Sequence, residues 1–288
     1  MPRTIVAACV AGLALVALTR LDAVTPRQAG TPTPDAIARQ VQDRDTGRDS
    51  RSEMRMKLYD RHGRARERAL TILSLRGRAA SSSAPGAAPG AIGDRLLIRF
   101  TYPNDIRGTG FLVWEHPEPK IEDERFLYLP SLGRVRRIAG AETQESFVGS
   151  DFTYEDISGR ELEDYSYAFA GGGSGSWTPT GGGAAQAVWL LESRRKDASA
   201  EFPRVVSMVL KDGALVVGAD IYNRRNEKQK VYNVRRIERI DGIWTVMDSE
   251  MVNSLEKTRT ELAVDSAKYN VGLQESDFSR RELERAGR

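Results

Sequence analysis

Side-chain polarity alternates with a period of two along most of this chain. Between residues 52 and 58 the apolar side chains of Met54, Met56 and Leu58 fall on one face, and charged residues occupy the other. Such alternation is typical of a strand with one buried face and does not suit a helix. An Asp-Arg-His-Gly turn at 60–63 then leads into a partner strand over 67–75. These residues predict an antiparallel hairpin.

The same pattern recurs toward the C-terminus. Pro, Gly and Asp or Asn separate the segments, and the Asp-Gly pairs at 212–213 and 241–242 are strong hairpin signals because a type I′ turn needs positive φ. The expected strands cover 95–102, 110–115, 125–129, 135–138, 187–193, 205–210, 214–222, 230–240, 243–251 and 258–264. A meander of this length curls into a barrel or half-barrel.

Helices are expected at both ends of this array. Thr33 can cap a helix that begins at Pro34 and ends at Gly47. Near the C-terminus, Ser279 and Glu282 form a capping box that starts a second helix. The predicted fold class is α+β, mainly antiparallel β.

The N-terminus has the pattern of a signal peptide. Arg3 precedes an apolar run over residues 5–18. That run falls short of the roughly 20 apolar residues that a membrane span requires. Residues 1–29 are therefore predicted to be removed on export to the periplasm, and an uncleaved N-terminal anchor is the alternative.

Residues 30–288 are expected to form a single domain without disulfides. Cys9, the one cysteine of the chain, lies inside the predicted signal peptide, so the mature part lacks thiolate chemistry. Two stretches rich in small residues, about 78–93 and 171–183, have no periodicity and are predicted to be flexible insertions.

Charge and motif content point away from nucleic acid and from catalysis. The net charge of the whole chain is +3, and outside the signal peptide basic and acidic residues balance to within one charge, too little for a polyanion binder. His62 lies in a turn and His116 in a loop, and no nucleophile elbow, P-loop or H-E-x-x-H sequence occurs. We expect no catalytic residue, no cofactor and no bound metal.

Carboxylates gather between residues 151 and 164, where a calcium site is an alternative to ion pairing. The segment lacks the D-x-D-x-D-G order of a calcium loop, so ion pairing with nearby arginines, Arg160 among them, is favoured. The residues predicted to form structural ion pairs are Arg134, Arg136, Arg137, Asp151, Glu155 and Asp156.

Large apolar residues occur on both faces of several strands, as at Leu96 and Leu97. One face of an antiparallel sheet usually contacts water, so a second apolar face must be covered by helices or line a cavity. Methionines would suit a variable apolar ligand, and ordinary core packing is the alternative for each residue. The candidate cavity-lining residues are Met54, Met56, Leu58, Leu96, Ile98, Phe100, Phe111, Val113, Leu127 and Leu129.

Three motifs together resemble a known family. They are F-T-Y-P-N-D-I-R-G-T-G-F-L-V-W at 100–114, Y-L-P-S-L-G-R-V-R-R-I at 128–138 and F-V-G-S-D-F-T-Y-E-D-I at 147–157. As a set they resemble the outer-membrane lipoprotein-sorting proteins of the LolA-like superfamily, in the branch found beside RND/MMPL-type exporters.

This resemblance implies a single curved sheet that forms an unclosed half-barrel, with helices covering its concave face. It also implies a periplasmic carrier of lipid or lipoprotein acyl chains, working between an inner-membrane exporter and the outer membrane. Its partners would be the lipid or lipidated cargo and an RND/MMPL-type exporter. The alternative is a structural adaptor of an envelope export complex that carries no cargo.

Overall fold

The computed structural model describes residues 31–77, 92–118 and 121–285. The predicted signal peptide with Cys9, and most of the predicted insertion at 78–93, lie outside the described residues. The described residues from Thr33 onward belong to one compact unit.

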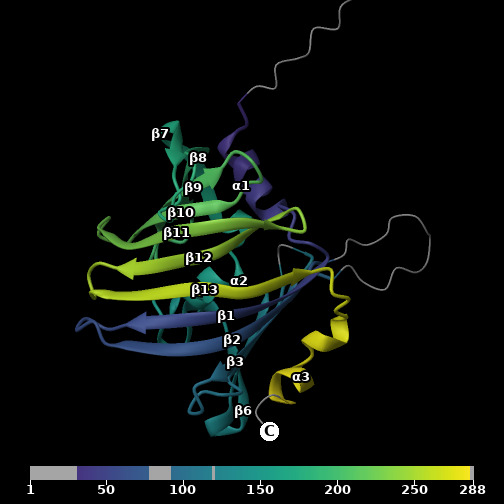
Figure 1. The fold of residues 1–288 in the computed structure, drawn as a ribbon. Helices are drawn as coiled ribbons and strands as arrows, with labels where there is room; N and C mark the ends of the chain where they lie inside the picture. The colour runs from purple at the N-terminus through teal and green to yellow at the C-terminus, as the bar shows by residue number, and fades with distance from the viewer. Residues whose placement is uncertain (1–30, 78–91, 119–120, 286–288) are drawn as a thin grey trace, which may run out of the picture. The chain divides into compact units, whose positions relative to one another are not determined.

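Thirteen strands in the described residues form one antiparallel sheet (Figure 1). Their bounds are β1 Asp49–Tyr59, β2 Ala65–Leu75, β3 Arg95–Tyr102, β4 Gly110–Trp114, β5 Glu124–Leu129, β6 Arg134–Ile138, β7 Tyr165–Trp177, β8 Gln186–Arg195, β9 Arg204–Leu210, β10 Val216–Tyr222, β11 Lys228–Ile240, β12 Ile243–Asn253 and β13 Thr258–Tyr269. Every pair of strands that follow each other in sequence is adjacent in the sheet, except β6 and β7.

The sheet is unclosed because β6 and β7 form its two edges. The strand order is β6-β5-β4-β3-β2-β1-β13-β12-β11-β10-β9-β8-β7, so the first and last strands pair at the centre. There Met56 lies opposite Leu262. The chain therefore passes from one edge of the sheet to the other through residues 139–164, which we call the crossing segment.

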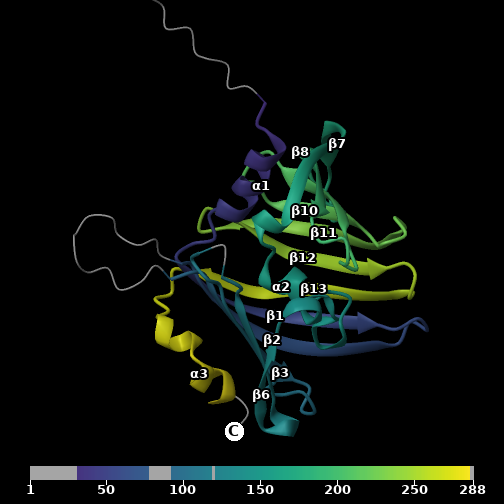
Figure 2. The same ribbon diagram turned by 180° about the vertical axis from the view of Figure 1, so that it is seen from behind.

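The crossing segment contains four short helices that lie over the concave face of the sheet (Figure 2). They are the 3-10 helices Gly140–Gln144, Phe147–Gly149 and Leu162–Asp164, and the α-helix α2, Tyr154–Ser158. A capping box starts α2, because Thr153 accepts from the backbone N–H of Asp156 at 3.0 Å and the Asp156 side chain accepts from that of Thr153. The predicted half-barrel with a helix-covered concave face is confirmed.

Two further helices match the cap signals in the sequence. Helix α1, Pro34–Asp43, begins after Thr33, whose hydroxyl accepts from the backbone N–H of Ala36 at 3.2 Å. Helix α3, Arg280–Arg285, begins after Ser279 in the same way, and the 3-10 helix Glu275–Phe278 precedes it. Helix α1 packs on β7 and β8, on the face that α2 also covers (Figure 2).

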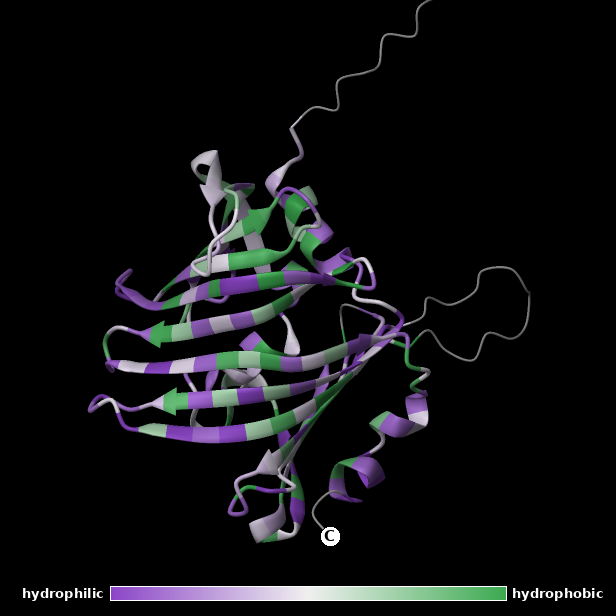
Figure 3. Cartoon of the chain, in the orientation of Figure 1, coloured by the Kyte–Doolittle hydropathy of each residue, from purple (hydrophilic) through white to green (hydrophobic). Residues whose placement is uncertain are grey.

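Helix α3 covers the opposite, convex face of the sheet. The expectation that the helices cover the concave face therefore does not hold for this helix. Phe278 and Leu283 are buried there against Leu97 and Leu112. Both faces of β3 and β4 are thus covered, which explains why large apolar residues occur on both sides of these strands. Figure 3 shows how apolar and polar residues alternate along the neighbouring strands.

The glycine-rich stretch at 171–183 corrects one prediction. Residues 171–177 continue strand β7, and only the residues after Trp177 form a connection to β8. Gly171, Gly172 and Gly173 all have positive φ, and the pairing with β8 skips from Phe169 to Ser174. Glycine makes this irregularity possible, and without side chains it leaves no periodic signal for a strand.

Candidate functional site

The concave face of β1 to β5 carries all ten candidate lining residues, and they form one apolar cluster. Six are buried and four are partly buried. The buried ones are Met56, Ile98, Phe100, Phe111, Val113 and Leu127, and the partly buried ones are Met54, Leu58, Leu96 and Leu129. Their common face follows from the period of two. Contact with a ligand stays a prediction for each of them.

Two aromatic side chains of the crossing segment fill the centre of this cluster. The rings of Phe147 and Tyr154 are 5.5 Å apart, and each lies within 5.5 Å of the Phe111 ring. Phe147 also lies 5.9 Å from Phe100 and is fully buried. The concave surface is thus occupied by the protein's own aromatic groups.

Sequence reasoning missed these central residues, together with Leu70 and Ile138 on the strands. Phe147 and Tyr154 lie in the third family motif. Two aromatic residues inside a connection between strands were the sequence signal that could have identified them as buried. Leu70 lies between Ala69 and Thr71 and is followed by Ile72 and Leu73, so alternation is weaker there than over residues 52–58. The third motif therefore contains residues that cover the concave face as well as a turn.

A second apolar group continues the concave face toward β9 and β10. Phe152 of the crossing segment is buried against Val205, Ile221 and Met251. Its ring lies 6.2 Å from that of Tyr232. The crossing segment therefore shields apolar surface on both halves of the sheet.

Asp151 holds the crossing segment to the centre of the sheet. Its carboxylate accepts hydrogen bonds from the hydroxyls of Thr258 and Thr260, the latter at 2.7 Å, and its backbone N–H donates to the Thr260 hydroxyl at 3.0 Å. Lys230 Nζ donates to the Asp151 carbonyl at 2.8 Å. Burial lowers the pKa of Lys230, and its ammonium lies 4.4 Å from the centroid of the Phe202 ring. These contacts join the segment to β11 and β13 through polar side chains.

Val148 is held in a conformation that valine rarely adopts. Its φ is 48° and its ψ is 37°, the left-handed region in which a β-branched side chain is strained. Arg68 donates to the Val148 carbonyl at 2.6 Å, and Gly149 follows with a φ of 76°. Strain at this tip lowers the free energy needed to detach it.

Two openings lie at opposite ends of the covered face. One has a volume of about 470 Å³ and includes Gly149 and Asp151 of the crossing segment, with Lys230 on the sheet side. The other, about 180 Å³, includes Ser158 and Glu115. Burial, with a smaller effect from Asp94, raises the pKa of Glu115 to about 8. Polar groups therefore line both ends of the apolar face.

Two of the three β6 arginines form ion pairs as predicted, but the expected partners among the carboxylates of residues 151–164 are wrong. Arg136 lies 3.2 Å from Glu142 and Arg137 lies 3.7 Å from Glu122. Arg134 forms no ion pair within the described part of the chain. These side chains stay at the β6 edge and pair with acidic residues close to that edge.

The carboxylates of the crossing segment find partners farther along its path. Glu155 lies 2.6 Å from Arg195 at the end of β8, and Asp156 lies 2.8 Å from Arg160. Arg160 was among the partners expected for these carboxylates, and the Arg195 pair was not expected. Glu155 faces the end of β8, although Ser158, three residues later, still accepts a hydrogen bond from Arg125 of β5 at 2.9 Å. The partner of Glu155 therefore depends on which way its side chain points and not on the distance that the segment has travelled.

The two histidines lie in the places that the sequence predicts, a turn for His62 and a loop for His116. Among the described residues no group of three His, Cys, Asp or Glu side chains is arranged to hold a metal ion. No helix in the same residues is long and apolar enough to cross a membrane.

Comparisons with known proteins support the assignment of this fold. A family model described as an uncharacterized protein matches residues 93–285. The structure of a DUF1329 family protein from Desulfovibrio piger is 29% identical, covering 87% of this chain and 97% of that one at a TM-score of 0.72. A Vibrio parahaemolyticus domain assigned to outer membrane lipoprotein sorting is 27% identical, with 87% and 97% coverage and a TM-score of 0.71.

The chain belongs to the LolA-like lipoprotein-sorting family. A LolA superfamily protein from Nitrosomonas europaea shares the fold of this LolA-like chain at 14% identity, with a TM-score of 0.61 and coverage of 88% and 100%. No curated protein matches the chain. The LolA-like family predicted from the three motifs is confirmed, and its exporter-associated branch stays a prediction.

Proposed function

We propose that this LolA-like protein carries a lipid, or the acyl chains of a lipoprotein, across the periplasm on the concave face of its sheet. The observation that carries the proposal is the cover over that face, which belongs to a connection between strands and not to the sheet itself. Apolar strand residues meet aromatic side chains of a segment that joins the two free edges of the sheet. An acyl chain would replace Phe147 and Tyr154 when the crossing segment moves away.

The energetics of such an exchange are favourable. An acyl chain gains about 0.8 kcal/mol for each methylene group removed from water. The strand residues contact apolar atoms before and after the exchange, so their own burial changes little. The cost is the release of the crossing segment, and the strained Val148 reduces that cost.

The attachment of the crossing segment is suited to release. It adds no strand to the sheet, since only one isolated bridge, between Ser146 and Thr153, occurs within it. Its contacts with the sheet run through side chains such as Asp151 and Arg68. Segments held in this way open with a smaller free energy than paired strands.

The route of the cargo is part of the same proposal. The family resemblance points to loading from an RND/MMPL-type exporter in the inner membrane and delivery at the outer membrane. The pattern of residues 1–29 supports export to the periplasm. No cofactor is needed, because the carriage of an amphiphile requires only a shielded apolar surface.

A second candidate is a structural adaptor without cargo. The close packing of Phe147 and Tyr154 on the strands favours it, because their rings lie 5.5 Å from each other and the Phe147 ring lies 5.5 Å from that of Phe111. In that case the crossing segment is permanent core. The two candidates differ in whether the segment opens.

Native mass spectrometry of protein purified from its host tests the proposal. Leu129→Glu places a charge on the concave face, where an acyl chain would desolvate it. Val135→Glu is the matched control, because Val135 is also partly buried, on the neighbouring strand β6, and packs with the cluster on the convex face. Wild-type and Val135→Glu protein should carry lipid, and Leu129→Glu should carry little or none.

Absence of lipid from wild-type protein, together with failure to bind a fluorescent fatty acid in vitro, would leave the adaptor as the function. Equal lipid content in Leu129→Glu and Val135→Glu would show that the cargo does not bind on the concave face.

A further inference from the structure

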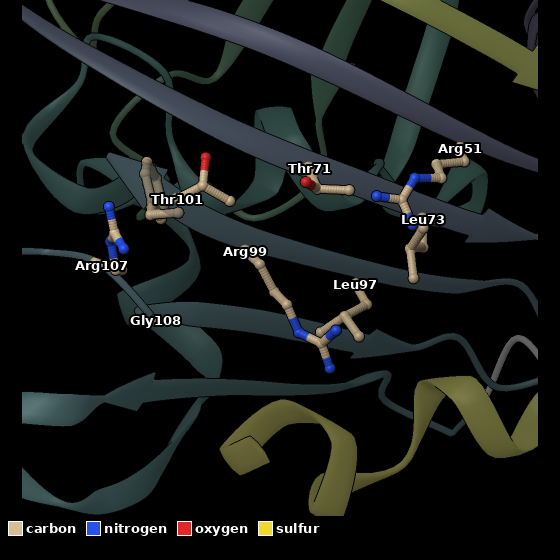
Figure 4. A pocket seen from close by; sticks show the side chains of 9 residues that line it. Arg51, Thr71, Leu73, Leu97, Arg99, Thr101, Arg107 and Gly108 are labelled. Atoms are coloured by element: carbon tan, nitrogen blue, oxygen red, sulfur yellow. The ribbon is translucent and has the colours of Figure 1, made fainter. Parts of the chain in front are cut away.

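A further groove lies on the convex face, beside helix α3 (Figure 4). Its volume is about 460 Å³. Leu73 of β2 and Leu97 of β3 line it with apolar surface, and Thr71 and Thr101 add hydroxyls. Phe100 of the concave cluster also borders the groove, while Leu73 and Leu97 belong to the cluster on the convex face.

Three arginines from different parts of the fold line this groove. Arg51 comes from β1, Arg99 from β3 and Arg107 from the connection between β3 and β4. Figure 4 shows Arg51 and Arg107 at opposite ends, with Arg99 between them. The groove therefore carries positive charge at both ends and in its middle, and guanidinium groups are the side chains best suited to bind an anion with several oxygen atoms.

The positive charge of the groove is only partly neutralised. Glu282 is 3.6 Å from Arg99 and 3.3 Å from Arg285, so one carboxylate serves two arginines. Arg51 is paired with Glu53 at 2.9 Å. Within the described residues Arg107 forms no ion pair.

Arg99 also has an unused donor. Its Nη2 donates to the Glu282 carbonyl, but its Nε is buried without a hydrogen-bond partner. An unsatisfied buried donor is rare and costly in proteins, and the usual reasons include an unfilled ligand site. Contact with α3 explains the position of Arg99, and it does not explain the two exposed arginines that flank it.

We propose that this groove binds a phosphate group, supplied by a phospholipid headgroup or by free phosphate. A tetrahedral phosphate has oxygens for Arg99 and for one of the two arginines that flank it, whereas one guanidinium can satisfy a planar carboxylate. Leu73 and Leu97 provide apolar contact for the carbon atoms next to a headgroup phosphate. The site lies outside the proposed cargo face and does not depend on carriage.

Binding assays on the exported chain test this inference. Co-sedimentation with phosphatidylglycerol vesicles examines a headgroup, and calorimetric titration with inorganic phosphate examines the free anion. Vesicles of digalactosyldiacylglycerol, which contains no phosphate, with oleate added to equal surface charge test whether phosphate is required. The site variant is Arg51→Gln with Arg107→Gln, two exposed positions. Arg55→Gln is the control, because Arg55 is exposed on β1 and does not line the groove.

The double variant should bind phosphatidylglycerol vesicles about tenfold more weakly or worse, and Arg55→Gln should bind like wild type. Binding of phosphate alone would also support the site and assign it to a free anion. Equal binding of the oleate vesicles, no binding of either phosphate source, or equal losses in Arg55→Gln would overturn the proposal. Leu129→Glu should bind vesicles normally, so this site and the carrier function can fail independently.

Discussion

Phe147→Ala should release the crossing segment from the concave face while leaving the sheet intact. Phe147 is fully buried and contacts the rings of Phe100, Phe111 and Tyr154. Its removal therefore leaves a cavity in the centre of the covered face. Any state in which the segment is detached already exposes this side chain and loses nothing by the substitution.

The magnitude follows from the size of the buried group. Truncating a buried phenylalanine to alanine costs about 3–5 kcal/mol when the site cannot collapse. Each 1.4 kcal/mol is about a factor of ten in an equilibrium constant, so the detached population should rise about a hundredfold or more. The wild-type segment is attached at Asp151 and Arg68 as well, so it stays mostly in place.

Amide hydrogen exchange measures this change directly. The hydrogen bonds from the Phe147 N–H to the Phe152 carbonyl and from the Ser150 N–H to the Phe147 carbonyl protect two amides of the segment. Their exchange should accelerate about a hundredfold or more in Phe147→Ala. Uptake of a fluorescent fatty acid should accelerate with it.

The reasoning is refuted if the segment and the strands exchange together. In wild-type protein the amides of Phe147 and Ser150 must exchange faster than those in the centres of β3 and β4. Equal rates would mean that the segment opens only when the whole protein unfolds. Leu112→Ala is the control, because Leu112 is equally buried on the other face of β4. It should lower global stability without selective opening of the segment.

Three further changes test other parts of the structure. Asp151→Ala removes the acceptor of the Thr260 hydroxyl and should lower the free energy of unfolding by about 2–4 kcal/mol, since hydrogen bonds to charged groups contribute about 1.5–3 kcal/mol each. Urea titration measures this change. An unchanged urea midpoint would mean that Asp151 does not hold the crossing segment to the sheet. The folded state raises the pKa of Glu115 from 4.5 to about 8, so wild-type stability should fall as pH rises through that range. Glu115→Gln cannot ionise and should flatten the dependence of stability on pH. Equal stability profiles against pH in the two proteins would contradict the raised pKa of Glu115. Gly110→Ala would place its Cβ 2.6 Å from Leu283 Cδ1 and should cost about 1–3 kcal/mol, with faster exchange in α3 but not in α1.

The strand residues of the candidate face could be predicted because alternation carries the information. Once Met54, Met56 and Leu58 share a face, pairing across hairpins assigns Ile98 and Phe111 to the same side. Cap residues such as Thr33 and Ser279 likewise located helices, because the cap is a contact within three or four residues. Local contacts of this kind can be predicted from residues that are neighbours in the sequence.

The ion pairs could not be predicted in the same way. Arg136 is about twenty residues from Glu155 in sequence, but the Glu155 side chain faces the end of β8, where Arg195 is its partner. The number of residues between two positions in a connection does not determine the direction in which the connection runs. The glycine stretch at 171–177 failed for a different reason, since a strand without side chains has no period.

The sequence by itself determined an antiparallel sheet, its hairpin turns, its helix caps and the side of each strand on which apolar residues lie. These features depend on φ, side-chain direction and contacts between adjacent segments. Only the tertiary structure decided that β1 pairs with β13 and that β6 and β7 are left as edges. It also decided that the connection between those edges covers the concave face with Phe147. Pairing between distant strands depends on how the whole sheet twists and curls, and no local pattern records that geometry.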